Sequence, residues 1–442
     1  MEHLSFDQPS TIWSIFGVQE LSPSVFRGIE SSLNLGHFNR PLLQNLSELS
    51  FDQNSGGVSL HDVGVFLGPR LKTLRLSTFS SFDGLEKFAV ALKARCPAIE
   101  HLYISSPDCS TRMKSCVLDL ICSLSSLRTL SCEGVTSDSQ TIKYLSSLPF
   151  LRSLNVRLPR RLAQEGFLDS SYNILPFLAM RHLDVSVASI IDAGEFLQVT
   201  SSFFGLESLL VAFDRIVPTP EQLRAFFTAM ERSSFRDTLT TFALRDQVEI
   251  DQVSPHSLDA HTLSPLLQCR NLEHVTIDIS YGHAAIDNSL LKEIALAWPC
   301  LRDISLHPYQ KAHLWHSKAN LQGLSYLAQH CQSLQSVSLQ FSVSLPETMM
   351  YPDKGIRCES LTRLFVSRSH VSDPRAVATF LADVFPNLKF HHDYVIRTRT
   401  GPRTMWDSEV LRDDEKSPEY IEMAARWKDV DQMLEARSCH NL

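Results

Sequence analysis

A six-residue pattern of apolar and polar positions recurs along nearly the whole chain. Its first, fourth and sixth residues are apolar, as in Leu71-Leu74-Leu76. Copies start at Leu46, Leu71, Ile99, Leu127, Leu151, Met180, Leu206, Leu239, Leu272, Leu301, Leu334 and Leu361, with a degraded copy at Leu388. Successive starts lie 24 to 33 residues apart. A phrase that returns at this interval indicates a chain built from one small repeated structural unit.

A second pattern, with helical periodicity, lies between successive copies. In one unit the i, i+3, i+4, i+7 spacing of a helix face is met by Leu85, Phe88, Ala89 and Leu92. Cys96-Pro97 ends this helix, because proline cannot continue it, and the pattern from Ile99 predicts a short strand of period two. Two other predicted helices begin with a capping residue before proline, Thr219-Pro220 and Asp373-Pro374.

A strand, loop and helix repeated in this order predict an α/β leucine-rich-repeat solenoid. Such a coil is right-handed, with parallel strands on one side and helices on the other. Strands pack about 4.8 Å apart and helices about 10 Å apart, so we expect a horseshoe with a concave strand face and a convex helix face. The longest repeats have 33 residues, and their extra segments Arg245–His261 and Pro308–Ala319 are expected to form edge loops.

The domain organisation follows from where the pattern begins and fades. Residues 1–394 are predicted to form a solenoid of about 13 to 14 repeats. Met1, Leu4 and Phe6 already fit the strand phrase, so we expect either upstream sequence or another element to cover this first strand. A linker is expected over 395–416, followed by an amphipathic helix over 417–437 that either docks on the last repeat or binds a partner.

Composition and charge narrow the class of protein. The chain has 442 residues, 43% hydrophobic and 20% charged, and a net charge of −8, which are values of a globular protein whose mild acidity disfavours a nucleic-acid partner. We find no basic start with an apolar core and no apolar run of 18 residues, so we expect neither a signal peptide nor a membrane span. Ten cysteines in such a chain indicate reduced thiols and a cytoplasmic or nuclear location.

The sequence holds little that could carry chemistry. Phosphate-binding, dinucleotide-binding, nucleophile-elbow and zincin motifs are missing, so we predict no catalytic, cofactor-binding or metal residues. The compact trio His391-His392-Asp393 falls on the degraded last copy and is interpreted as an exposed edge. Four cysteines stand three residues before a repeat start and are interpreted as small buried residues: Cys96, Cys269, Cys331 and Cys358.

The candidate binding residues are those that the strand pattern turns away from the core. The third, fifth and seventh positions of each copy should line the concave face. The predicted partner-binding residues are Arg75, His101, Tyr103, Asn155, Arg157, His182, Asp184, His274, Asp278, Asp303, Arg363 and Phe365. Arginine and aromatic side chains among them are typical of protein interfaces. Leu210 and Ala243 make the middle of this face locally apolar, flanked by Phe213 and Arg245.

The residue pattern of the repeats resembles that of a known family. The order Cys-x-x-Leu-x-x-Leu-x-Leu is approximated by Cys96–Ile104, Cys331–Leu339 and Cys358–Val366. It resembles the cysteine-containing leucine-rich repeats of F-box proteins, and the irregular spacing and the start at Leu4-Ser5-Phe6 are similar to fungal F-box-like repeat families. The resemblance implies a receptor whose repeats present a substrate for ubiquitination. It implies binding to a cullin-ligase adaptor only where an F-box lies upstream of the first strand.

Three hypotheses about function follow. The first is a non-catalytic protein-interaction module, the substrate-recognition part of an F-box-type ubiquitin-ligase receptor, with its partner on the concave face or the edge loops. The alternative is a free-standing leucine-rich-repeat scaffold or inhibitor without a ubiquitin link. The third, an enzyme or small-molecule receptor, would require a deep cavity with convergent polar groups. Binding to the ligase adaptor separates the first two.

Overall fold

A computed structural model describes most of the chain. The described residues are 2–4, 43, 45–52, 60, 62–77, 82–105, 111–160, 177–199, 203–213, 217–246, 254–279, 281–284, 286–306, 318–343, 355–366, 369–390 and 418–440. They divide into two compact units. The first holds Met1–Ala212 with Ser233–Phe235, and the second holds Phe213–Arg232 with Arg236–Leu442.

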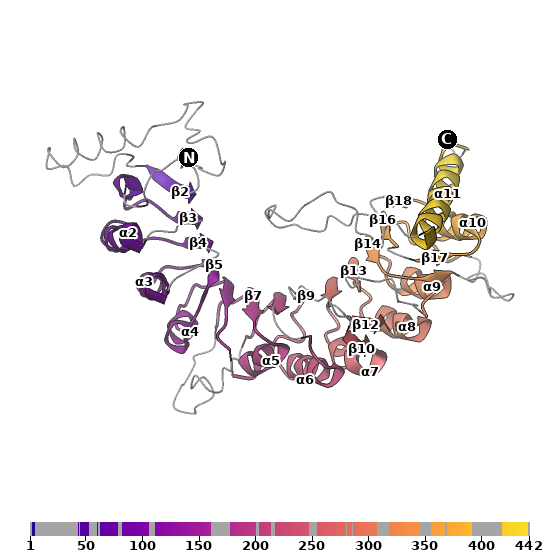
Figure 1. The fold of residues 1–442 in the computed structure, drawn as a ribbon, viewed down its shortest axis with the longest axis horizontal. Coiled ribbons are helices and arrows are strands. Elements are labelled where there is room, and N and C mark those ends of the chain that lie inside the picture. The colour runs from indigo at the N-terminus through magenta and orange to yellow at the C-terminus, as the bar shows by residue number, and fades with distance from the viewer. Residues whose placement is uncertain are drawn as a thin grey trace. The chain divides into compact units, whose positions relative to one another are not determined.

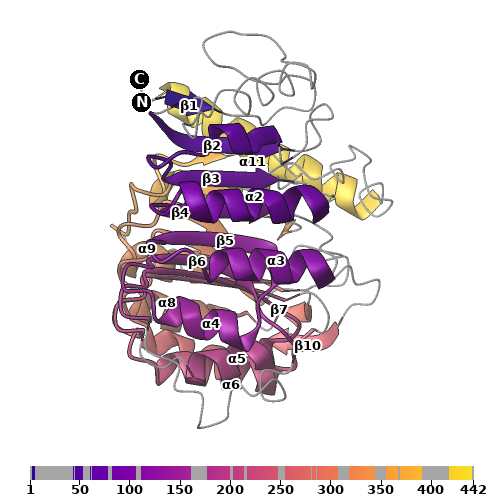
Figure 2. The same cartoon turned by 90° about the vertical axis from the view of Figure 1, so that its left-hand side faces the viewer.

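The strands of the first unit form a parallel sheet in chain order (Figure 1). They are β1 (Glu2–Leu4), β2 (Leu46–Asp52), β3 (Thr73–Ser77), β4 (His101–Ser105), β5 (Thr129–Thr136), β6 (Ser153–Arg157), β7 (His182–Val187) and β8 (Ser208–Phe213). One face of this sheet is covered by a 3₁₀ helix, Asp62–Phe66, and by α2 (Phe82–Arg95), α3 (Thr111–Ile121), α4 (Ser139–Ser146) and α5 (Ile190–Val199). Figure 2 shows α2, α3 and α4 as one layer in front of these strands.

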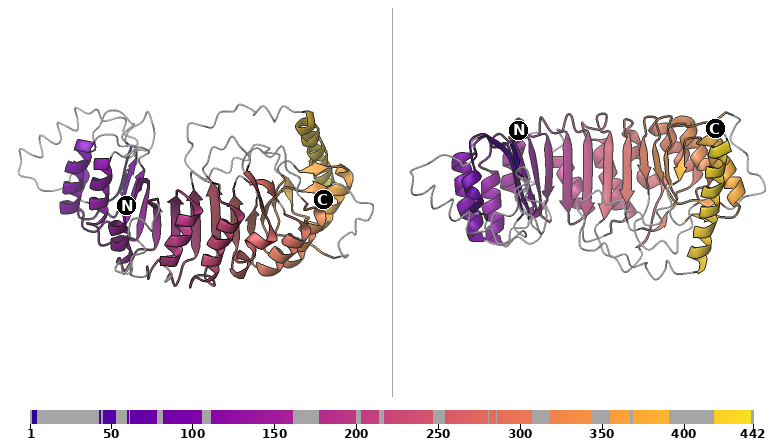
Figure 3. Two further views of the ribbon diagram at one scale, coloured as in Figure 1. Left: turned by 60° about the horizontal axis from the view of Figure 1, so that its bottom comes forward. Right: turned by 90° about the horizontal axis from the view of Figure 1, so that it is seen from above.

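The second unit repeats the same arrangement. Its main parallel strands are β9 (Thr241–Asp246), β11 (His274–Asp278), β13 (Asp303–Ser305), β14 (Ser336–Ser338), β16 (Arg363–Phe365) and β18 (Lys389–Phe390). Its helices are α6 (Pro220–Glu231), α7 (Ala260–Leu263), a 3₁₀ helix at Leu266–Gln268, α8 (Asn288–Ala297), α9 (Leu321–His330), α10 (Pro374–Val384) and α11 (Pro418–His440). Figure 3 shows the strands of each unit running side by side.

Burial confirms how each repeat is built. In α2 the side chains of Leu85, Phe88 and Leu92 are fully buried, and the helix ends at the residue before Cys96. In β3 buried and half-exposed residues alternate, with Leu74 in the core. The fold is therefore an α/β leucine-rich-repeat solenoid, in which apolar strand and helix positions meet between the two layers.

Adjacent repeats are joined by backbone hydrogen bonds where each strand begins. The carbonyl of Lys72, at the second pattern position, accepts the N–H groups of Glu100 and His101 at 2.9 Å each. The carbonyl of Glu100 in turn accepts from Arg128 at 2.7 Å and Thr129 at 3.0 Å. Thr240, Glu273, Arg302 and Gln335 accept in the same way in the second unit. Strand register is thus set by main-chain atoms at a fixed place in the repeat.

Both predicted helix caps are confirmed. The Thr219 side chain accepts from the Gln222 N–H while the Gln222 side chain accepts from the Thr219 N–H, a complete capping box for α6. Asp373 accepts from two N–H groups of α10. Asp287, which the sequence analysis did not single out, caps α8 by accepting from the Leu290 N–H. This bond is the main reason why the pKa of the Asp287 carboxyl lies below its usual range.

The cysteines that precede repeat starts lie at the junction of helix and strand. Cys96, Cys269, Cys331 and Cys358 are all completely buried. Burial raises the pKa of the Cys96, Cys269 and Cys331 thiols to about 12, so these thiols stay protonated at neutral pH. The Cys331 thiol donates to the Trp298 carbonyl of the preceding repeat at 3.4 Å. These cysteines therefore help to join neighbouring repeats, as small apolar residues with a weak donor.

The prediction of one edge loop is partly wrong. Within Arg245–His261, residues Ser254–Leu258 form strand β10, which pairs in parallel with β12 (Tyr281–Ala284). A second small pair joins β15 (Ser342–Val343) and β17 (His370–Val371). The segment forms a strand because a parallel neighbour from the next repeat satisfies its backbone groups, which no local signal indicates. Residues 308–317 of the other expected loop lie outside the described residues.

The C-terminal helix α11 packs against the last repeat. Its Trp427 and Val430 side chains are buried, and the Trp427 indole N–H donates to the Ser369 carbonyl at 2.7 Å. The Arg426 guanidinium donates to the Val371 carbonyl at 2.8 Å. Residue 417, where the helix was expected to begin, the linker 395–416 and the trio His391-His392-Asp393 lie outside the described residues.

Candidate interaction surface

The strand face, defined here as the third, fifth and seventh pattern positions of the repeats, carries the candidate site. Along β3, β4 and β6 these residues stay at least partly exposed, while the residues between them are buried. The phase predicted from the sequence is thereby confirmed. Since the strands lie in register, residues at the same position in neighbouring repeats form rows across each unit.

Arg75 is the centre of the best-defined cluster in the first unit. Its guanidinium carbon lies 4.0 Å from the centre of the Tyr103 ring, and its Nε lies 3.2 Å from Glu48 Oε1. Arg75 and Tyr103 are paired across β3 and β4, so the cation rests on the neighbouring aromatic face. The Arg75 side chain remains 43% exposed, which leaves part of the guanidinium available to a ligand.

Further along the same face, polar side chains bridge neighbouring strands. His101 Nδ1 lies 3.0 Å from Thr129 Oγ1, and Asn155 Nδ2 donates to Glu133 Oε1 at 2.7 Å. The Asn155 Oδ1 atom is buried and has no hydrogen-bond partner among the described residues. Such an acceptor costs free energy until a donor reaches it.

The remaining predicted residues of the first unit differ in exposure. His182 is exposed at the start of β7, while Asp184 in the same strand and Arg157 in β6 are half-buried. Asn155 pairs with Asp184 and Ser153 with His182 across the two strands. The structure therefore brings four predicted residues, Asn155, Arg157, His182 and Asp184, onto two adjacent strands.

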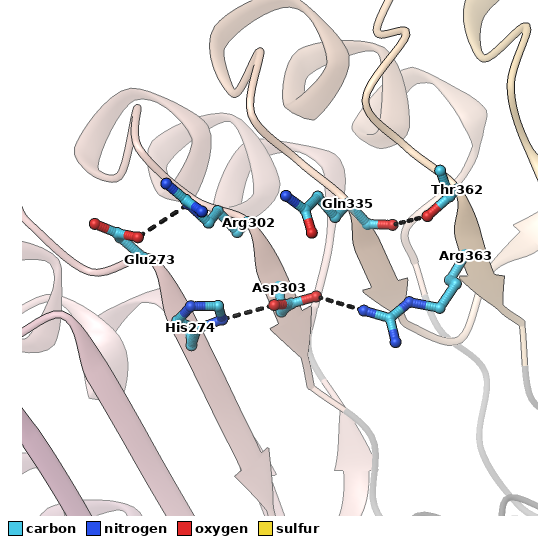
Figure 4. A network of polar contacts seen from close by, with 7 residues as sticks. All are labelled: Glu273, His274, Arg302, Asp303, Gln335, Thr362 and Arg363. Atoms are coloured by element: carbon cyan, nitrogen blue, oxygen red, sulfur yellow. Dashed lines mark hydrogen bonds and ion pairs between the residues drawn. The ribbon is translucent and has the colours of Figure 1, made fainter.

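In the second unit, three predicted residues form one connected group. His274 Nδ1 lies 2.6 Å from Asp303 Oδ2, and Arg363 Nη2 lies 3.3 Å from Asp303 Oδ1 (Figure 4). These side chains come from β11, β13 and β16, and each is between one third and one half exposed. The carboxylate is thus shared by two cationic or donor groups. Asp278 and Phe365, also predicted, are half-buried on β11 and β16.

The predicted apolar centre of the face needs one correction. Leu210 is half-buried and Ala243 is buried on its strand, but Phe213 does not flank them on the surface. Phe213 is completely buried and belongs to the core. It stands two residues beyond the core residue Val211, so the period of two turns it inward.

A row of ion pairs was missed by the sequence analysis. The second pattern position holds Lys72, Glu100 and Arg128 in successive repeats, and both cations contact Glu100, at 2.7 Å and 2.9 Å. The hydrogen bond from Lys72 is the largest cause of the lowered pKa of the Glu100 carboxyl. Arg302 pairs with Glu273 at 3.0 Å in the second unit (Figure 4). The alternating charges of Lys72, Glu100 and Arg128 at the second pattern position could have indicated this row from the sequence alone.

The described residues offer no candidate metal site. They contain no group of three or more histidine, cysteine or acidic side chains that could hold a metal ion. None of the helices that can be described is long and apolar enough to cross a membrane. What the structure does present is a repeated row of polar, charged and aromatic side chains on the strands of a leucine-rich-repeat solenoid.

Known structures match this chain at low sequence identity and with TM-scores below 0.5. No protein-family model and no curated protein sequence matches the chain. The TLR13–ssRNA13 complex gives 17% identity and a TM-score of 0.40, covering 74% of this chain and 40% of that chain. An internalin, InlF from Listeria monocytogenes, gives 15% identity and a TM-score of 0.42, covering 84% and 94%. The yeast Rad7 and Elc1 complex gives 17% identity and a TM-score of 0.38, covering 80% of this chain and 73% of that chain. At these identities the likeness concerns the fold alone.

Proposed function

We propose that the chain is a non-catalytic protein-interaction module that binds a partner protein on its strand face. The proposal rests on arginine side chains that contact a neighbouring ring or carboxylate and yet remain partly exposed. Arg75, stacked on Tyr103, and Arg363, held by Asp303, are fixed in position yet 43% and 49% exposed. Preorganised arginine and aromatic groups lose little conformational entropy on binding, and they dominate the energetics of protein interfaces.

The biological setting that we propose is substrate recognition for an F-box-type ubiquitin ligase. Its support is the cysteine-containing repeat pattern over Cys96–Ile104, Cys331–Leu339 and Cys358–Val366. The alternative is a scaffold or inhibitor without a ubiquitin link, which the same strand face would serve equally well. The two differ in one interaction, binding to the adaptor subunit of a cullin ligase.

Charge reversal on the strand face tests the binding role. We expect Arg75→Asp and Arg363→Asp each to weaken partner capture by about tenfold, because each removes a preorganised cation from the face. Arg224→Asp, on the exposed side of α6, is the matched control and should leave capture unchanged. The measurement is quantitative cross-linking of the whole chain in its native cells. Equal loss in all three variants, or loss in none, would contradict the proposal.

Adaptor binding tests the ubiquitin link separately. The purified chain, with any upstream sequence of its transcript, is titrated with the cullin-ligase adaptor in a calorimeter. Saturable binding supports the receptor role. If strand-face partners are captured while the adaptor gives no heat, the scaffold alternative is the correct one.

A further inference from the structure

Three consecutive turns of the first unit expose bulky apolar side chains. Phe150, Leu178 and Phe204 are 57%, 66% and 62% exposed, and they lie in the turns that lead into β6, β7 and β8. The equivalent turns of the other described repeats hold small or polar pairs, namely Pro69-Arg70, Pro97-Ala98, Ser125-Ser126, Asp237-Thr238, Arg270-Asn271, Pro299-Cys300, Gln332-Ser333, Glu359-Ser360 and Pro386-Asn387. We call the three apolar turns, with the second pattern positions beside them, the turn edge.

The turns of this edge lie next to one another. Phe177 and Phe203, the buried residues just before Leu178 and Phe204, stack with ring centres 5.3 Å apart. The backbone N–H of Arg181 donates to the Arg152 carbonyl at 2.8 Å, so β6 and β7 begin side by side. Apolar side chains that a soluble protein exposes singly are ordinary, whereas a contiguous row is typical of an interaction site.

Arginines stand beside these apolar residues in the same order. The second pattern position holds Arg128, Arg152 and Arg181 in successive repeats. The Arg128 guanidinium carbon lies 5.9 Å from the centre of the Phe150 ring. Arg181 Nη1 donates to the Gly205 carbonyl, beside Phe204, at 2.7 Å. Each of these two arginines therefore reaches the apolar turn of the following repeat.

Arg152 is the middle arginine of the three. Its exposed side chain makes no hydrogen bond or ion pair with the described residues. Beside the three apolar turns, Arg128 contacts the Glu100 carboxylate and Arg181 contacts the Glu207 carboxylate, while Arg152 stands between them. Among the described residues at the second pattern positions here, three positive charges therefore stand against two negative ones, on a chain whose net charge is −8.

We propose that the turn edge binds an extended segment of a partner protein in which bulky apolar residues alternate with aspartate or glutamate. Neighbouring strands lie about 4.8 Å apart and an extended chain rises about 3.3 Å per residue, so a segment of a few residues can span the three turns. Apolar side chains of the segment would cover Phe150, Leu178 and Phe204. Its carboxylates would pair with the guanidinium of Arg152 and with the exposed parts of Arg128 and Arg181, which bind carboxylates in a bidentate way. This surface is separate from the strand face and serves a second partner segment.

A synthetic peptide tests this proposal on the whole chain. The probe is the fluorescent peptide Asp-Phe-Asp-Leu-Glu-Phe-Asp, and binding is followed by anisotropy. We expect saturable binding that weakens as salt is added, because salt screens the attraction between the carboxylates of the peptide and the arginines of the turn edge. A peptide with lysine in place of the acids, and one with serine in place of the apolar residues, should bind at least about tenfold more weakly.

Variants of exposed residues locate the binding. Phe204→Ser and Arg152→Glu should each weaken peptide binding by about tenfold, and Leu178→Ser provides an independent third variant. Leu296→Ser on α8 and Arg224→Glu on α6 are the matched controls, since Leu296 is 56% exposed and Arg224 is also exposed. Circular dichroism melts of all variants should coincide with that of the unmodified chain.

Several outcomes would overturn the proposal. They are binding equal to that of either control peptide, equal loss in the control variants, and tighter binding of an oligothymidine strand than of the acidic peptide. Self-association of the chain that Phe204→Ser abolishes would show that a second copy covers this edge instead. The strand-face variants Arg75→Asp and Arg363→Asp should not alter peptide binding, so the two surfaces are tested independently.

Discussion

Gly323 shows how a single residue joins two repeats. It lies in α9, where the backbone N–H groups of Asn320 and Gly323 donate to Asn288 Oδ1 at 3.0 Å and 3.1 Å. Asn288 Nδ2 donates to Asn320 Oδ1 at 2.9 Å, so one amide side chain satisfies the beginning of the next repeat's helix. A Cβ atom at position 323 would lie 2.5 Å from Leu291 Cδ1 and 2.9 Å from Asn288 Oδ1. The sequence did not reveal this contact, because its partners are separated by a whole repeat.

We predict that Gly323→Ala lowers the free energy of unfolding by about 1 to 3 kcal/mol. Alanine favours a helix by about 1 kcal/mol over glycine, but here the methyl group would displace the end of the buried Leu291 side chain and the Asn288 amide oxygen that caps α9. Gly64→Ala is the matched control, because no atom lies within 4 Å of the Cβ position there. Urea unfolding followed by circular dichroism measures both. Equal stability of the two variants would refute the close approach.

At the scale of an element, α11 is held by one aromatic anchor. The sequence predicted its apolar stripe, and Trp427, Val430 and Leu434 on that stripe are buried. Docking on the last repeat was one of the two expectations for this helix, but the stripe did not reveal which residues it would contact. The carbonyl that accepts from Trp427 belongs to Ser369, 58 residues earlier, and such a pairing leaves no local signal.

Trp427→Ala should release α11 from the last repeat. Loss of a fully buried tryptophan costs about 3 to 5 kcal/mol, and an isolated helix is marginal in water, so the detached segment should unfold. Hydrogen exchange of residues 418–440 should rise to nearly that of an unfolded chain. Ile421→Ala is the control, because Ile421 is 58% exposed. Unchanged exchange in Trp427→Ala would show that other contacts hold the helix.

At the scale of the whole molecule, the sequence predicted the repeat well and the contacts between repeats poorly. Core positions such as Leu74 and Leu154 could be read because apolar periodicity reports burial directly. Strand β10 could not be predicted from the sequence, because its conformation depends on pairing with a parallel neighbour and not on its own residues. On the strand face, the pairing of His274 with Asp303 depends on register between repeats, which follows only once the strands are aligned.

Leu154→Asp should unfold the repeats around β6 while leaving more distant repeats of the first unit better protected. Leu154 is 1% exposed, and a buried unpaired carboxylate should cost more than about 4 kcal/mol. Repeats interact with their nearest neighbours, so the loss of hydrogen-exchange protection should decrease with distance from β6. Arg75→Asp, on the exposed strand face, should change the unfolding free energy by less than about 1 kcal/mol. Uniform loss of protection would show that the unit unfolds in a single step.

The carbonyls that set strand register, such as those of Lys72 and Glu100, have a consequence for how such a protein can evolve. Main-chain atoms align each strand with the next, so the side chain at that position is unconstrained by the alignment. Lysine, glutamate, arginine, threonine and glutamine all occupy it along this chain. Segments between strands can likewise lengthen or shorten without shifting the rows that they separate. Natural selection can therefore replace the chemistry displayed by one repeat at a time and acquire a new partner while the architecture is inherited intact.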